Sequence, residues 1–187
     1  MKRVLFSLLA LVCFQVQAAS LLDDKGVDML KADKVYLLSN LHPDEQNSRL
    51  YAVNYQLPAL LPMCTEVVIT KFNRKKMIFS VPSRGNREYT YLYHKAAAEP
   101  FEDHLKLFFG SSCDDSKVAK MSKKDQEGIK QGRPIVGMTK AGILLAMGHP
   151  PKHVNPTLDS TEWMYWRNKF ARTAITFDDK GIVVGIR

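Results

Sequence analysis

Hydrophobic residues recur with a period of two in several short runs of the first half of the chain. The clearest are two β-rich runs on either side of the basic turn Phe72-Asn73-Arg74-Lys75, which predict a hairpin over 65–71 and 76–81. Three further strands are expected over 34–38, 48–56 and 88–94. In the last of these, alternation places Tyr89, Tyr91 and Tyr93 on one face. Short polar turns join the runs, which predicts a mostly β, meander-like first half.

Helical spacing appears in four segments. A short amphipathic helix is expected within 19–33, and a second over 99–109 that ends at Gly110. Ser122 is expected to cap a helix that runs to about Gln131. Thr139 caps another that ends at Gly148, before two prolines. Three β-rich runs follow, over 163–167, 172–177 and 181–187, so the second half is predicted to be helix, helix, strand, strand, strand.

The beginning of the chain has the pattern of a secretory signal peptide. Lys2 and Arg3 precede an apolar run over 4–14, and small residues follow at Ala18 and Ala19. We expect cleavage near Ala18 or Ala19 and a mature protein that is periplasmic or secreted. The apolar run is too short to span a bilayer, and no later run is longer. No transmembrane segment is therefore expected in the mature chain.

The three cysteines are consistent with an exported protein that has no lipid anchor. Cys13 lies inside the apolar run behind a bulky valine, where a lipid-attachment motif needs a small residue, so no lipid anchor is expected. The mature chain keeps Cys64 and Cys113, and two thiols in an oxidising compartment are often paired. A Cys64–Cys113 disulfide is the prediction, and two buried free thiols are the alternative. Metal binding is not expected, because no Cys-x-x-Cys occurs and prolines separate His149 from His153.

Composition excludes little. The 187 residues are 45% hydrophobic and 25% charged, as in an ordinary globular protein of one or two domains. The net charge of +8, which includes two leader residues, favours acidic partners such as an anionic envelope surface, or is a solubilising bias. No hydrolase, zinc-protease or nucleotide-loop motif is present, so neither catalytic residues nor a cofactor are expected. Export disfavours nucleic acid as a partner.

Four short motifs follow one another in the last third of the chain. They are Gly137-Met138-Thr139, Gly148-His149-Pro150, Trp163-Met164-Tyr165, and Phe177-Asp178-Asp179-Lys180-Gly181-Ile182-Val183. In this order and spacing they resemble the small outer-membrane lipoprotein family called SmpA, OmlA or BamE. The resemblance covers about 130–187. Two features differ from the family: the lipid-anchor cysteine after the leader is replaced by Ala19-Ser20, and about a hundred β-rich residues precede the motifs.

The resemblance implies an α+β fold for the second half, with two helices packed on one face of a three-stranded antiparallel sheet, as also in secreted β-lactamase inhibitors. The first half has the rhythm of small SH3-like barrels. We therefore expect a signal peptide over 1–19, a β-rich domain with a closing helix over 20–115, and an SmpA/OmlA-like domain over 116–187. The family's roles are binding and assembly, so the resemblance implies a non-catalytic function.

The strand that begins at Trp163 provides the interaction candidates. Alternation sends Trp163 and Tyr165 to one face of the sheet and Met164 and Trp166 to the other, and the helices cover only one face. The other face is either a binding surface or is covered by the first domain. Aromatic residues and arginine are enriched at binding hot spots. The candidates are Trp163, Tyr165, Trp166, Arg167, Lys169 and Phe170.

Three function classes follow. The first is a periplasmic protein-interaction module in envelope or outer-membrane assembly or maintenance, with an envelope protein as partner. The second is a peptidoglycan- or glycan-binding module that acts through an SH3-like first domain. The third is a secreted enzyme inhibitor or an enzyme, for which a cysteine–histidine nucleophile at Cys64 or Cys113 is the candidate chemistry.

Overall fold

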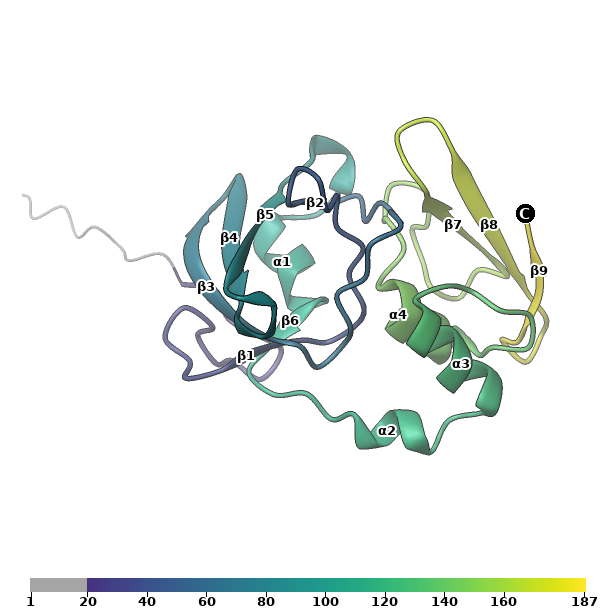
Figure 1. Ribbon diagram of the computed structural model, residues 1–187. Helices are drawn as coiled ribbons and strands as arrows, with labels where there is room; N and C mark the ends of the chain where they lie inside the picture. Colours follow the sequence, from purple (N-terminus) through teal and green to yellow (C-terminus); the bar gives the residue numbers. More distant parts are fainter. Residues whose placement is uncertain (1–19) are drawn as a thin grey trace, which may run out of the picture.

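The computed structural model describes residues 20–187, and the predicted signal peptide lies outside this range. The chain has an α+β fold in which two sheets are built from consecutive parts of the sequence (Figure 1). The first part contains β1 Val35–Leu37, β2 Arg49–Tyr51, β3 Glu66–Asn73, β4 Lys76–Val81, β5 Arg87–Leu92, α1 Phe101–Lys106 and β6 Phe109–Gly110. The second contains α2 Ser116–Ala119, α3 Lys123–Gln131, α4 Lys140–Met147, β7 Glu162–Trp166, β8 Arg172–Phe177 and β9 Val183–Ile186.

The first sheet has six strands in the order β2-β5-β4-β3-β1-β6. The predicted hairpin is confirmed as β3 and β4, and the strand with the alternating tyrosines as β5. The order differs from the expected meander, because β2 pairs parallel to β5 and β1 lies between β3 and β6. Strands β1 and β2 are each only three residues long, and each pairs with a strand that lies far from it in the sequence.

Three local predictions in this half are wrong. No helix forms within 20–33, because Asp23 and Asp28 accept hydrogen bonds from nearby backbone N–H groups and hold the chain in turns. The strand expected over 48–56 is limited to β2, and Asn54 has a φ of 49°. The helix expected over 99–109 is limited to Phe101–Lys106, and Phe109 belongs to β6.

Aromatic side chains fill the core of the first half. Tyr89 and Tyr91 of β5 are fully buried, as the alternation predicts, and pack with Phe79 and Phe109. Tyr93, at the end of the same face, is 36% exposed. Helix α1 closes this core with Phe101 and Leu105, among other side chains.

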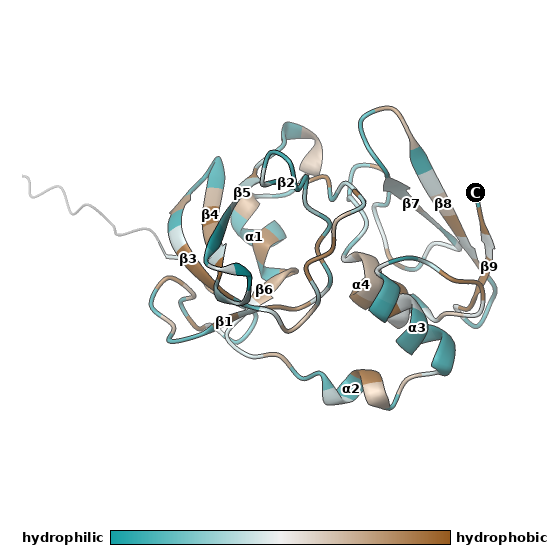
Figure 2. Cartoon of the chain, viewed as in Figure 1, coloured by the Kyte–Doolittle hydropathy of each residue, from teal (hydrophilic) through white to brown (hydrophobic). Residues whose placement is uncertain are grey.

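The second sheet is antiparallel in the order β7-β8-β9, as expected. Helices α3 and α4 supply Ile129, Ile143 and Ala146 to a second core, which also contains side chains of all three strands. Figure 2 shows the contrast between the two helices: α3 is mostly hydrophilic, whereas α4 is mostly hydrophobic. The sequence of α4 leaves it almost no polar side, so other elements must surround it.

One buried carboxylate joins the beginnings of the two helices. Ser122 and Thr139 cap α3 and α4 as predicted, each accepting a hydrogen bond from a backbone N–H in the first turn. Asp125 is 1% exposed; its Oδ1 accepts from the Thr139 N–H at 2.8 Å and its Oδ2 from the Ser122 hydroxyl at 2.8 Å. Gly142 lies against Asp125, and a Cβ there would overlap Oδ1. The helices therefore pack closely and in one register.

None of the helices within 20–187 is both long and apolar enough to cross a membrane.

Candidate functional site

The two halves meet at the C-terminal end of α4. The last carbonyl groups of a helix have no partners within the helix, and here side chains of the first half supply them. Asn40 Nδ2 donates to the carbonyl oxygen of Ala146 at 3.2 Å, and Asn54 Nδ2 donates to that of Met147 at 2.8 Å. Gln56 Nε2 also donates to Met147, at 3.0 Å. The halves are thus held by buried directional hydrogen bonds.

His42 belongs to the same junction. It is 6% exposed, and its Nε2 lies 3.2 Å from the carbonyl oxygen of Ala146, so this nitrogen carries the proton. Burial lowers the pKa of His42, and its hydrogen bonds to backbone carbonyls only partly oppose this. His42 is therefore a neutral donor at neutral pH.

A pocket of about 430 Å³ opens beside this junction, and we call it the junction pocket. It exists because the inner face of the second sheet extends beyond the helices that cover it: Thr173 and Ile186 form part of the lining past the end of α3 at Gly132. The first half closes the opposite side with the segment 56–60. The remaining lining residues include Arg133, Pro134, Met147 and Arg167.

The turn between β7 and β8, residues 167–171, forms a second distinctive surface, which we call the hairpin tip. Phe170 is 84% exposed, the largest exposure among the large hydrophobic residues of 20–187. Its backbone N–H donates to Asn168 Oδ1 at 2.8 Å, as does that of Ala171 at 3.0 Å, so the turn is ordered. The ammonium group of Lys169 lies 4.8 Å from the Phe170 ring centroid.

The predicted interaction candidates separate into two groups. Trp163 and Tyr165 are fully buried under the helices, so neither has a surface to offer a partner. Arg167, Lys169 and Phe170 are exposed together at the hairpin tip.

Trp166 lies on the opposite face, half-buried between the stacked ring of His153 and the guanidinium of Arg172, which is 4.0 Å from its ring centroid. The covering residues come from the second half itself. The first half contacts this strand through a backbone bond from the Gln56 N–H to the Trp166 carbonyl oxygen, at 2.8 Å.

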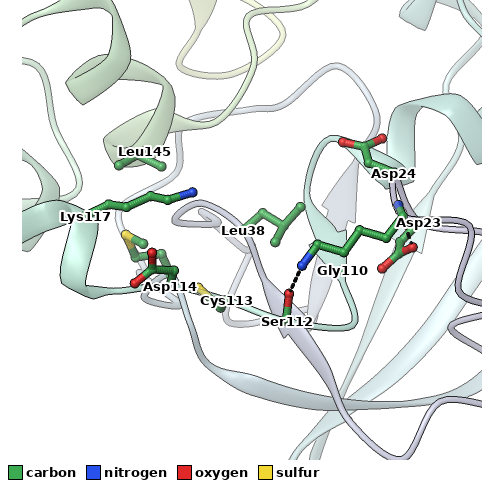
Figure 3. Close-up of a pocket in the computed structure, with 11 residues that line it drawn as sticks. Asp23, Asp24, Leu38, Gly110, Ser112, Cys113, Asp114, Lys117 and Leu145 are labelled. Carbon is green, nitrogen blue, oxygen red and sulfur yellow. Dashed lines mark hydrogen bonds between the residues drawn. The ribbon is translucent and has the colours of Figure 1, made fainter.

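Cys64 and Cys113 form the expected disulfide. It ties the chain that leads to α2 to the loop before β3 and lies beside a hollow of about 310 Å³ (Figure 3). Leu38 and Leu145 line this hollow together with carboxylates and lysines, among them Asp24 and Lys117. Because the lining carries both negative and positive side chains, it favours neither an anionic nor a cationic ligand.

The group of titratable residues most similar to a catalytic relay lies in the first half. Tyr91 Oη is 2.9 Å from His104 Nε2, and His104 Nδ1 is 2.9 Å from Glu99 Oε1. Lys152 Nζ reaches the second Glu99 oxygen at 3.1 Å. Burial raises the pKa of Tyr91 and lowers that of His104. Burial also acts to raise the pKa of Glu99, but hydrogen bonds from His104 and Lys152 outweigh it and lower this pKa.

The relay is therefore an ionised glutamate, a neutral histidine and a neutral tyrosine. Tyr91 and His104 are 0% and 3% exposed, and both histidine nitrogens already have partners. This geometry matches a structural network that stabilises the first core, and Lys152 extends it to the second half.

Comparison with protein-family models, with curated proteins and with solved structures finds no match to this chain. Sequence reasoning did not identify the junction residues Asn40, His42, Asn54 and Gln56, which lie in predicted loops or at the end of a predicted strand. Nor did it identify Arg133 as a lining residue of the same pocket as Arg167, because only the tertiary fold brings both to this pocket.

Proposed function

We propose that this protein is a non-catalytic interaction module of the periplasm that serves envelope or outer-membrane assembly or maintenance. The hairpin tip carries the proposal. Burial of a phenylalanine side chain stabilises a protein by roughly 1.5–3 kcal/mol, and the exposed Phe170 does not contribute this free energy. Its turn is nevertheless held by a hydrogen bond to Asn168. Aromatic residues and arginine are enriched at protein interfaces, and Arg167 lies in the same turn as Phe170.

Two further observations support the proposal. The leader pattern and the disulfide are both compatible with an oxidising compartment. The packing of α3 and α4 on a three-stranded antiparallel sheet agrees with the kinship to SmpA/OmlA (BamE-type) proteins that we propose from the motifs. Because the fold of such a module does not determine its task, the binding surface has to be tested directly.

The test is site-specific photo-cross-linking in a Gram-negative bacterium that exports the protein. A photoreactive amino acid replaces Phe170 in one variant and Val68, which is 48% exposed on β3, in the control. We expect discrete adducts with envelope proteins from position 170 and not from position 68. Adducts that are absent at 170, or equal at both positions, would contradict the proposal.

A second measurement separates the alternatives. The variant Phe170→Ser should lose the adduct partner in a pull-down and keep the melting temperature, because the side chain contacts little of the core. Retention of the protein on purified peptidoglycan, unaffected by Phe170→Ser, would instead favour a glycan-binding role for the first half.

A further inference from the structure

The charged side chains that line the junction pocket are all positive within residues 20–187. Arg133 and Arg167 line it, and no aspartate or glutamate from residues 20–187 does so. Neither arginine forms a salt bridge within that range. The hollow beside the disulfide, by contrast, has three aspartates in its lining. Guanidinium groups without a carboxylate partner are suited to bind an anion of planar geometry.

The rest of the lining is largely apolar. Leu57, Leu60, Met147 and Ile186 face the pocket together with Pro58 and Pro134. The volume of about 430 Å³ is within the range of ordinary ligand sites and exceeds what a single side chain fills. A ligand for this pocket therefore combines an apolar group with a carboxylate.

The pocket also adjoins the open end of a strand edge, because the backbone of Gly137 and Met138 pairs with β9 only at Val183. Strand β9 is the last strand of its sheet, and the N–H and carbonyl of Arg187 pair with those of Ala174 in β8. Because alternate residues of an edge strand point their backbone groups outward, the N–H and carbonyl of Ile186 face away from β8. These groups have no backbone partner within 20–187, and Ile186 itself lines the pocket. An extended peptide can pair with such an edge.

We propose that the junction pocket binds the C-terminal residue of an extended peptide. Arg133 and Arg167 hold the terminal carboxylate, the apolar lining accepts the last side chain, and the peptide backbone pairs with the outer edge of β9 at Ile186. This inference goes beyond the proposed function, because it assigns a second site that does not depend on Phe170. It names a class of partner: a protein or peptide with a free, apolar C-terminus.

The test uses fluorescein-labelled pentapeptides with the sequence Gly-Ser-Gly-Ser followed by Val, Leu, Met or Phe. Each is made with a free C-terminal carboxylate and as the amide, and binding to the purified protein is measured by fluorescence anisotropy. We expect at least one free acid to bind. Its amide should bind at least about tenfold more weakly, since the charge-assisted pair between carboxylate and arginine is lost.

Three substitutions locate the site. Arg133→Gln and Arg167→Gln should each weaken binding of the free acid about fivefold or more, whereas Arg172→Gln, a matched loss of charge on the opposite face, should not. All three arginines are exposed, so unchanged melting temperatures are expected. Phe170→Ser should leave peptide binding intact, which separates a failure of this inference from a failure at the hairpin tip.

Several results would overturn the inference: no binding of any free-acid peptide, equal binding of acids and amides, or unchanged binding when Arg133→Gln and Arg167→Gln are combined in one variant. Equal affinity for decanoate, which has a carboxylate and no peptide backbone, would also overturn the assignment to a peptide. Loss of binding in Phe170→Ser would place the peptide on the hairpin tip instead of in the pocket.

Discussion

Asn40 Nδ2 donates a hydrogen bond of 2.7 Å to the carbonyl oxygen of Ile129, a residue 89 positions later in the chain. The same nitrogen donates to Ala146, and Asn40 Oδ1 accepts from the Met63 N–H at 2.9 Å. One side chain that is 1% exposed thus joins the end of α3, the end of α4 and the loop before β3. The relative position of the two halves depends on it, and so does the geometry of the pocket between them.

We therefore expect Asn40→Ala to lower the free energy of unfolding by about 3 kcal/mol, because it removes three buried hydrogen bonds and leaves the Met63 N–H without its acceptor. Urea denaturation of the purified protein measures this. Asn47→Ala is the control, since Asn47 is exposed and its contacts are with Asp44 three residues away. Equal effects of the two substitutions would show that the junction contributes no special stability.

Reduction of the Cys64–Cys113 disulfide should destabilise the protein by up to about 4 kcal/mol, as loop-closure entropy predicts for a separation of 49 residues. The measurement is urea unfolding with and without a reducing agent. In the Cys64→Ser, Cys113→Ser double variant the reducing agent should have no effect. Native protein whose two thiols alkylate freely before reduction would contradict the pairing.

Trp163→Ala and Trp166→Ala should differ strongly. Trp163 is fully buried and lies 4.7 Å from the Phe177 ring centroid, so its truncation should cost about 3–5 kcal/mol and leave little folded protein. Trp166 is half-buried between His153 and Arg172, and its loss should cost clearly less. Thermal unfolding of both variants decides the order; a larger loss for Trp166 would mean that the buried face is assigned wrongly.

Asp23 gives a pH dependence with a defined sign. Burial acts to raise its pKa, but hydrogen bonds from the hydroxyl and N–H of Ser111 and from the N–H groups of Val27 and Lys25 outweigh it, and the pKa falls to about 2. Because the folded-state pKa is below the unfolded-state value of about 3.9, the carboxylate stabilises the fold fully above pH 4. This stability is lost as the pH falls from about 4 to 2.

The corresponding experiment compares unfolding free energies of the wild type and Asp23→Asn between pH 2 and pH 6. The variant should be less stable at pH 6, and the difference should shrink as the pH approaches 2. A difference that stays constant over this range would show that the Asp23 carboxylate titrates equally in the folded and unfolded chain.

Local chemistry determined several elements from the sequence alone. Ser122 and Thr139 cap their helices because a short hydroxyl side chain satisfies the first N–H groups wherever it stands. The β3–β4 hairpin and the alternation along β7 likewise depend on neighbours in sequence, so both are confirmed. Trp163 and Tyr165 could be assigned to one face in this way, although alternation cannot tell which face the helices cover.

Only the tertiary structure decided the rest. Asp125 of α3 accepts the N–H of Thr139, the cap residue of α4, and the three-residue strand β2 is placed by its pairing with β5. Asn40 and Asn54 donate to carbonyls about a hundred residues away. Arg133 and Arg167 line one pocket for the same reason. These relationships form between segments distant in sequence, where burial and hydrogen-bond satisfaction over the whole fold outweigh the weak local preferences of a loop.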